Sequence, residues 1–277
     1  MKKLTVFCAA ACLAASAAAQ NHPDLHEVLD RQKGRNLIEI PKGTYTLDVR
    51  SNGPYKFHNL TDVHINGNGS TVICNNQEQA FSFYNCVRVE LHDLTIDYDP
   101  LCFTQGEITA VAEDGSWFDV RIDEGYPVTG LAANRVQFYD PQTRLLKRNS
   151  ITTYTSNYSA LKQLGHNLFR AVKNGTWSAG EQVGDLVVMD VKTDKPNAGV
   201  HTVMLNKCYN TKLENVTVYG SNTFSFFEKE GYANEYRNCV VDRGPMPQGI
   251  RPRLRSGNAD GIHSSQARKG PTVTGCK

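Results

Sequence analysis

The segment Cys86-Val-Arg-Val-Glu-Leu-His-Asp-Leu-Thr-Ile96 recurs later in the chain, and this recurrence decides the expected fold. It can be laid without a gap over Cys208-Tyr-Asn-Thr-Lys-Leu-Glu-Asn-Val-Thr-Val218. In both copies apolar residues alternate with polar ones, which is typical of a β-strand with one buried face. Shorter segments with the same alternation are Leu60-Thr-Asp-Val-His-Ile-Asn-Gly67, Arg237-Asn-Cys-Val-Val241 and Pro271-Thr-Val-Thr-Gly-Cys276.

The spacing of these segments predicts a solenoid. Asn215 and Asn238 stand at matching corners and are 23 residues apart, within the range of solenoid repeats. A short unit of this kind cannot bury its apolar side alone, so successive units bury it by stacking. Because no amphipathic helix falls within the period, leucine-rich and all-helical repeats are disfavoured. We therefore expect an all-β chain built as a right-handed parallel β-helix.

The repeat is interrupted between about Leu101 and Val200. Gly106–Ile122 predicts a hairpin of two alternating strands around Asp114-Gly115. Further strands are expected at Arg135–Tyr139 and Gln182–Met189, with helix or loop around Ser159–Gly165. This pattern favours a small antiparallel β-barrel or sandwich inserted at residues 101–200, and we expect the barrel.

The remaining segments complete the expected domain organisation. A short helical pattern at Asp24–Lys33 suits a cap over one end of the β-helix. Residues 21–100 are then the cap and the first β-helix turns, and residues 201–277 are further, incomplete turns. Met1–Gln20 has the charged start, apolar middle and small-residue end of a signal peptide, so we expect a bacterial protein that is exported to the periplasm, the outer surface or the medium.

Composition narrows the possible partners. The net charge is +2, which gives no general reason to expect nucleic acid as a partner. No apolar run after the signal is long enough to span a bilayer. Six cysteines follow the signal, an even number that permits disulfides in an exported protein. Since no Cys-x-x-Cys pair is present, the cysteines favour free core residues over a zinc site or a disulfide framework.

Chemically active residues gather in Gly249-Ile-Arg-Pro-Arg-Leu-Arg-Ser-Gly-Asn-Ala-Asp-Gly-Ile-His263. Asp260 is the candidate catalytic acid. Inverting glycosidases place two carboxylates about 6.5–9.5 Å apart, and neighbouring turns of a β-helix can supply such a pair. The alternative is that Asp260 only forms a turn with Gly261.

The candidate substrate-binding residues lie around Asp260. Alternation places Arg251, Arg253 and Arg255 on one side of an extended strand, where guanidinium groups can bond carboxylates or sugar hydroxyls. The alternative is a solvated basic loop. The other candidates are His263, Asn258, Glu228 and Glu230. No second ligand has metal-binding spacing near His263, so we expect neither a metal nor another cofactor.

Three features together resemble a known family. Ile96-Asp-Tyr-Asp-Pro-Leu-Cys-Phe-Thr-Gln-Gly106, the inserted barrel and Ile250-Arg-Pro-Arg-Leu-Arg-Ser-Gly-Asn-Ala-Asp-Gly-Ile-His-Ser264 are similar to β-helix glycoside hydrolases of the α-1,3-galactosidase type. The resemblance runs from about Asn36 to the end of the sequence. It implies an exported enzyme that removes terminal α-linked galactose from glycans with inversion and without a metal, using Asp260 as one acid of the site. The family carries two adjacent aspartates about one turn later, so we expect this chain to be truncated before them.

Two other functions remain open at this point. Asn258-Ala-Asp-Gly-Ile also resembles a segment of polygalacturonases, and the arginines suit an anionic substrate, so the chain could act on uronic-acid polymers by hydrolysis or lyase chemistry. The third possibility is a β-helix that binds glycans without turnover, or an inactive remnant.

Overall fold

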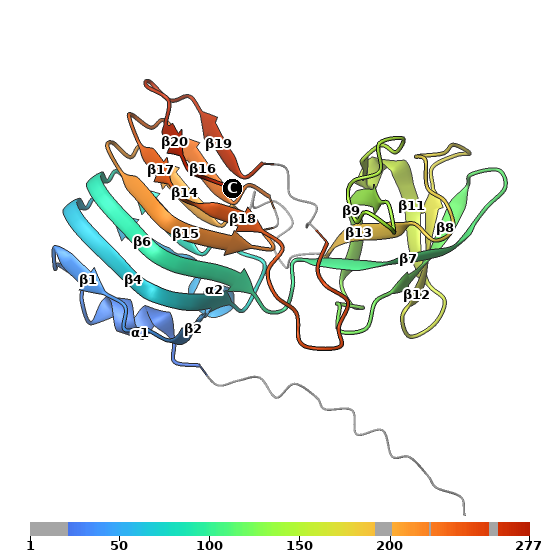
Figure 1. Cartoon of the computed structure of the whole chain (residues 1–277), viewed down its shortest axis with the longest axis horizontal. Helices are drawn as coiled ribbons and strands as arrows, with labels where there is room; N and C mark the ends of the chain where they lie inside the picture. Colours follow the sequence, from blue (N-terminus) through green and yellow to red (C-terminus); the bar gives the residue numbers. More distant parts are fainter. Residues whose placement is uncertain (1–21, 192–200, 222, 255–259) are drawn as a thin grey trace, which may run out of the picture.

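The computed structural model describes residues 22–191, 201–221, 223–254 and 260–277. It consists of a lobe of parallel strands and a lobe of antiparallel strands lying side by side (Figure 1). The described helices are short, with α1 at Leu25–Asp30 and α2 at Val49–Asn52. The predicted all-β class is confirmed.

The first lobe contains two parallel sheets (Figure 1). The order of the larger sheet is β1 (Leu37–Glu39), β4 (Thr61–Cys74), β6 (Val87–Tyr98), β15 (Lys212–Tyr219), β17 (Glu235–Arg237) and β20 (Thr272–Thr274). In addition, β2 (Thr44–Leu47) pairs with β4, and β18 (Val240–Asp242) pairs with β15. The smaller sheet has the order β3 (Tyr55–His58), β5 (Phe81–Tyr84), β14 (Val203–Asn206), β16 (Phe226–Lys229) and β19 (Ile262–Ser265).

The two copies of the repeat predicted from the sequence form the neighbouring strands β6 and β15. Strand β6 pairs with β15 in the register Leu91↔Leu213, Leu94↔Val216 and Ile96↔Val218. All six of these side chains are buried in the core shared by the two parallel sheets. The alternation that defined the repeat is therefore the alternation between the face turned to this core and the outer face.

Asn and Asp residues occupy the corners of the larger sheet. Asp93, Asn215 and Asn238 all have positive φ, between 52° and 57°, a conformation that Asn and Asp adopt more readily than most residues. The Asn215 side-chain amide donates to Asp93 Oδ1 at 2.9 Å, which joins two of these corners. The corner residues are thus explained by backbone conformation, as expected.

The helix predicted at one end is present and capped. The Asp24 side chain accepts a hydrogen bond from the backbone N–H of His26, which fixes the first turn of α1. Leu25 and Leu29 are fully buried against the core of the parallel sheets. No helix among residues 22–191, 201–221, 223–254 and 260–277 is long and apolar enough to cross a membrane.

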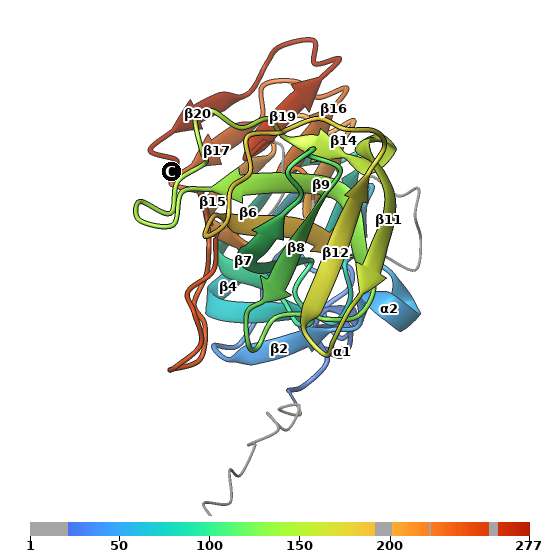
Figure 2. The same ribbon diagram turned by 90° about the vertical axis from the view of Figure 1, so that its right-hand side faces the viewer.

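The second lobe is a nearly closed antiparallel barrel (Figure 2). Its strand order is β10 (Thr153–Tyr154), β9 (Leu131–Tyr139), β13 (Leu186–Val191), β7 (Phe103–Val111), β8 (Trp117–Ile122), β12 (Leu168–Lys173) and β11 (Tyr158–Gln163). The hairpin predicted at Gly106–Ile122 is confirmed as β7 and β8. The helix or loop expected around Ser159–Gly165 is wrong, because residues 158–163 form β11, which pairs with β12.

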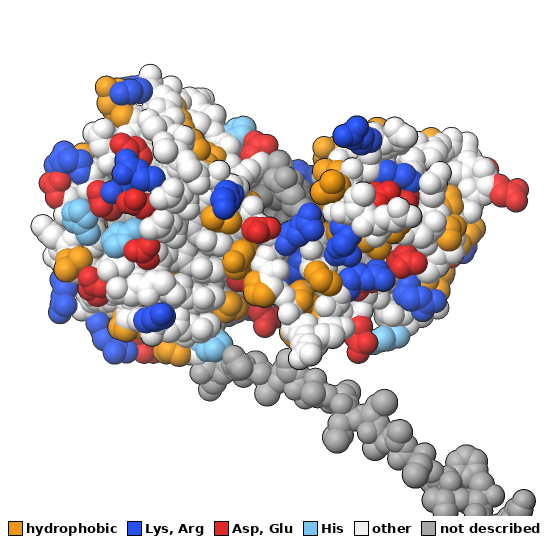
Figure 3. Space-filling view, viewed as in Figure 1, with side chains coloured by type: hydrophobic (Ala, Val, Ile, Leu, Met, Phe, Trp, Pro, Cys, Tyr) orange, Lys and Arg blue, Asp and Glu red, His pale blue; other side chains and the backbone are white. Residues whose placement is uncertain are grey.

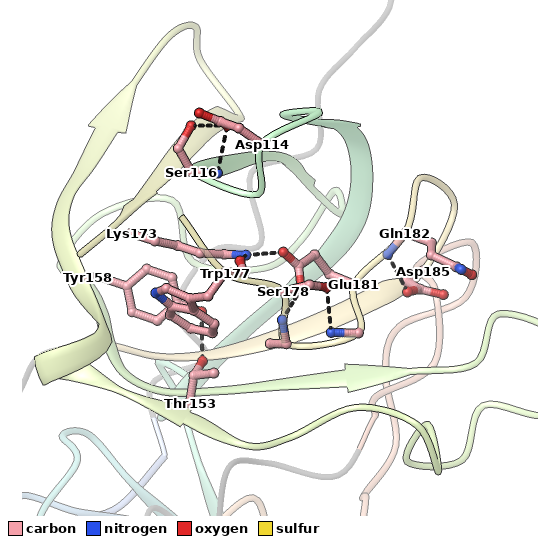
Figure 4. A network of polar contacts seen from close by, with 12 residues as sticks. Asp114, Ser116, Thr153, Tyr158, Lys173, Trp177, Ser178, Glu181, Gln182 and Asp185 are labelled. Carbon is pink, nitrogen blue, oxygen red and sulfur yellow. Dashed lines mark hydrogen bonds and ion pairs between the residues drawn. The ribbon is translucent and has the colours of Figure 1, made fainter. Parts of the chain in front are cut away.

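One pair of buried charges lies inside this lobe (Figure 4). Lys173 and Glu181 form an ion pair, and both side chains are fully buried. Glu181 also accepts from the backbone N–H of Ala179 at 2.7 Å, while the Lys173 ammonium lies 4.6 Å from the centre of the Trp177 ring. Nearby, the hydroxyls of Thr153 and Tyr158 are 2.6 Å apart. These contacts satisfy Lys173, Glu181, Thr153 and Tyr158 and indicate a structural role for them.

Residues 243–254 form a loop between β18 and β19 that contacts both lobes. The Arg253 guanidinium donates to both carboxylate oxygens of Asp97 at the end of β6, at 2.7 and 3.0 Å, and both side chains are buried. The backbone N–H of Leu254 donates to Gln105 of the barrel at 2.7 Å. This segment is therefore bonded to both lobes.

Candidate functional site

Asp260 and His263 form a half-exposed pair at the edge of the smaller parallel sheet. Asp260 lies just before β19, and its carbonyl accepts from the backbone N–H of Ser225 at 3.2 Å. His263 Nδ1 is 2.7 Å from Asp260 Oδ2, and the two side chains are 38% and 46% exposed. The imidazole N–H donates to the carboxylate and fixes its orientation. The other ring nitrogen, Nε2, is the one that can bond a ligand hydroxyl.

Aromatic rings gather beside this pair. Phe224 lies parallel to His263, with ring centres 4.2 Å apart, and parallel to His201, with ring centres 4.8 Å apart. Phe227 contacts His201 at 4.4 Å and His263 at 5.6 Å in tilted geometry. All four side chains are partly exposed. Together they form an aromatic cluster, defined as His201, Phe224, Phe227 and His263.

Strand register brings part of this cluster together. In the parallel pairing of β16 with β19, Phe227 is directly opposite His263, so both side chains stand on the outer face of the sheet. His201 precedes β14, the strand on the other side of β16, and its Nδ1 is 3.0 Å from the Thr223 hydroxyl. Burial, with a smaller contribution from His263, lowers the pKa of His201 to about 4. The His201 ring is therefore neutral at neutral pH and can present an uncharged flat face.

Glu228 is not brought to this site. Its side chain is fully buried on the inner face of the smaller sheet, opposite Ser264 and in the same row as Leu205. Asn234 donates to one carboxylate oxygen at 2.9 Å, and the Ser264 hydroxyl donates to the other at 3.3 Å. Burial raises the pKa of Glu228 above its ordinary value, although these hydrogen bonds oppose the shift. Glu228 lies between the sheets, whereas Asp260 is half exposed.

Glu230 and Arg253 also lie apart from the pair. Glu230 occupies a corner with φ of 54°, and its carboxylate is 3.9 Å from the Lys207 ammonium. Arg253 is held by Asp97 in the buried ion pair described above, so both ends of its guanidinium are occupied. The structure gives Arg253 a role in joining the lobes.

Arg251 belongs to a group of arginines on the barrel side of the junction. Its guanidinium is 3.0 Å from Asp123 and 3.3 Å from Glu107. Burial and the nearby charges of Arg251 and Arg243 lower the pKa of Arg144, so these three cations are close together. Lys and Arg side chains gather on this face beside the hollow between the lobes (Figure 3). We call Arg144, Arg243 and Arg251 the arginine group.

Two sequence candidates, Arg255 and Asn258, fall outside the described residues. Sequence analysis also missed His201, Phe224 and Phe227. The run Phe224-Ser-Phe-Phe227 was the available signal, because three aromatics in four residues exceed what one buried face of a strand can take. The described residues contain no group of three or more His, Cys, Asp or Glu side chains placed to hold a metal ion.

Comparison of the sequence with models of protein families finds no match. A search among curated proteins finds no match either.

Proposed function

We propose that the chain is a glycoside hydrolase that removes terminal α-1,3-linked galactose from glycans with inversion. The observation that carries the proposal is the half-exposed Asp260 carboxylate, held by His263 beside the flat ring of Phe224. Carboxylates carry glycoside hydrolysis, and pyranose rings present an apolar C–H face that packs on aromatic rings. The site thus combines a reactive group with a surface for a sugar.

The proposal includes a right-handed parallel β-helix for the first lobe. The chain alternates between the two parallel sheets, with β3, β5, β14, β16 and β19 in one and β4, β6, β15, β17 and β20 in the other. Connections between parallel strands are strongly biased to the right hand. Such a coil supports the proposal because it repeats the same outer position at every turn, so that Phe227 and His263 stand side by side.

In this mechanism Asp260 acts as one of the two carboxylates of the inverting reaction, protonating the leaving oxygen or activating water. His263 orients Asp260 through Nδ1 and binds a sugar hydroxyl through Nε2. Phe224 is stacked between His201 and His263, so the sugar ring packs its apolar face against Phe227, which is tilted to its neighbours. We assign the second carboxylate to none of the described candidates, since Glu228 is buried between the sheets and Glu230 faces Lys207.

The test is galactose release from p-nitrophenyl α-galactoside and from α-1,3-linked galactose oligosaccharides. We expect any galactose release to fall by at least about 100-fold in Asp260→Asn, which keeps the shape but loses the acid–base function. Phe227→Ala is expected to raise KM more than it lowers kcat, because it removes area for the sugar and leaves the stacked pair of Phe224 and His263 in place. A folded, unaltered chain that binds these sugars but releases no galactose would contradict hydrolysis and support a glycan-binding protein.

The arginine group favours one second candidate, action on uronic-acid polymers. Three guanidinium groups close to one another suit a carboxylate-bearing chain. Polygalacturonate separates the two candidates: new reducing ends without free galactose would indicate a polygalacturonase, and unsaturated ends would indicate a lyase.

A further inference from the structure

The outer face of the smaller parallel sheet continues beyond the aromatic cluster. Strand register places Met204 of β14 beside Phe227 of β16. Two residues further along the strands, Asn206 of β14 stands between Lys229 of β16 and Tyr84 of β5. Side chains two positions apart point to the same side of a strand, so these residues share the face on which Phe227 stands. All five are at least partly exposed.

This face is longer than one sugar. Strands β19 and β5 are separated by β16 and β14, so the face extends roughly 14 Å across the strands from His263 to Tyr84, at about 4.8 Å per spacing. A single pyranose ring packed against Phe227 covers only the first part of it. The sugars that follow in a longer glycan can therefore lie over β14 and β5.

Asn206 offers an unused polar group on this face. Its side-chain Oδ1 is buried and accepts no hydrogen bond. Buried polar atoms in folded proteins are nearly always hydrogen-bonded, so this exception needs a partner. The side-chain amide has a donor end and an acceptor end, and its last torsion is broad, so a turn of the amide presents its oxygen outward. In that orientation Asn206 can bond a sugar hydroxyl.

Tyr84 offers an exposed ring beside Asn206. Its side chain is one of the exposed large hydrophobic groups, at 38%. The His58 ring meets it edge-on, with ring centres 5.6 Å apart, and the Lys207 ammonium lies over it at 5.9 Å from the ring centre. These contacts fix the position of the ring. A tyrosine so placed combines an apolar surface with a hydroxyl, which suits the mixed surface of a sugar.

We propose that the outer face of the smaller sheet is an extended glycan-binding site, in which Asn206 and Tyr84 bind the sugars that follow the terminal galactose. The inference rests on the proposed function, because that function places the terminal sugar against Phe227. The occupant is the remainder of the same glycan, since the face is continuous with the aromatic cluster through Met204. Asn206 and Tyr84 then determine a preference for oligosaccharides over single galactosides.

The experiment measures binding by isothermal titration calorimetry, with the full chain carrying Asp260→Asn so that the ligands are not consumed. The ligands are the disaccharide of α-1,3-linked galactose and a tetrasaccharide that ends in the same linkage. We expect the tetrasaccharide to bind about tenfold more tightly than the disaccharide, because only the longer ligand reaches Asn206 and Tyr84.

Variants of the extended face identify the residues responsible. Tyr84→Ala should weaken tetrasaccharide binding by about five- to tenfold, and Asn206→Ala by about fivefold, while neither changes disaccharide binding more than about twofold. Tyr232→Ala is the matched control and should change neither affinity. Tyr232 is similarly exposed, at 43%, but lies between β16 and β17, off the smaller sheet.

The two proposals fail in different ways. Absence of binding of both ligands would contradict the terminal-galactose site itself, and the inference with it. Binding of the disaccharide without a gain from the tetrasaccharide would overturn the extended face alone. The same holds if the tetrasaccharide binds more tightly but Tyr84→Ala and Asn206→Ala leave that gain intact.

Discussion

At the scale of single residues, Glu228 is an ionisable side chain facing the core between the parallel sheets. Phe226 and Glu228 are two positions apart on β16, so both point inward. The alternation in Phe226-Phe-Glu-Lys229 already contained this information, because a buried Phe226 requires a buried Glu228. The charge of Glu228 suggested a position at the surface, whereas the two-residue period of the strand places its side chain in the core.

Glu228→Gln should stabilise the protein at neutral and alkaline pH. Burial raises the folded-state pKa of Glu228 above the unfolded value, so the native state binds this proton more tightly. The unaltered protein gains stability from Glu228 below the ordinary carboxyl pKa and loses it as pH rises through the raised pKa. Glutamine does not titrate and can still accept from Asn234, so the variant should be more stable by on the order of 1 kcal/mol above this window.

Urea unfolding at several pH values measures this difference. Glu230→Gln is the matched control, because Glu230 is a half-exposed corner residue on the same strand connection. It removes a carboxylate that lies outside the core and so controls for the loss of one charge. Equal pH profiles for Glu228→Gln and the unaltered protein would show that Glu228 stays protonated or hydrated throughout.

At the scale of elements, the corner residues determine where each strand of the larger sheet bends. Asn215 has φ of 53° and bonds the corner residue Asp93 on the neighbouring strand. Asn and Gly tolerate this conformation, whereas β-branched residues are strained in it. The corner is therefore a requirement of backbone geometry more than of side-chain chemistry.

Asn215→Val should destabilise the protein by about 1–2 kcal/mol, because Val must adopt a left-handed conformation. Asn215→Gly should cost about 1 kcal/mol or less, since glycine accepts this φ and only the hydrogen bond to Asp93 is lost. Chemical denaturation of both variants measures the difference. If Val and Gly destabilise equally, the hydrogen bond and not the backbone conformation determines the corner.

At the scale of the whole molecule, the Asp97–Arg253 ion pair joins the parallel lobe to the segment that contacts the barrel. Arg253→Met should destabilise the protein by about 3–5 kcal/mol, because it leaves the Asp97 carboxylate buried without its partner. Adding Asp97→Asn should restore part of the loss, since the unpaired charge is removed. A double-mutant cycle in urea measures the coupling, and additive effects would show that the pair is not linked energetically.

Features that depend on local sequence patterns could be predicted, whereas contacts between residues far apart in the chain could not. The pairing of β6 with β15 was predictable because the two strands carry the same alternation of apolar residues. Two copies of such a unit bury their apolar sides by stacking on each other. The site was harder to predict. Asp260 and His263 are close in sequence, but His201 and Phe224 reach them only through the order of β14, β16 and β19. Likewise, Arg253 lies in a loop, and nothing local indicates that its partner is Asp97, 156 residues away.

The pairing of β7 with β13 has a consequence for how the chain folds. These strands begin and end the barrel, and Phe103 of β7 is directly opposite Asp190 of β13. Once the barrel has formed, its two ends are held together, and the entropy of closing a long connection between β6 and β14 has already been lost. For the pairing of β6 with β15, the formed barrel then acts as a short connection, which lowers the effective contact order of this pairing. We expect barrel formation to precede the joining of these strands, so slowing the barrel should slow the assembly of the parallel lobe.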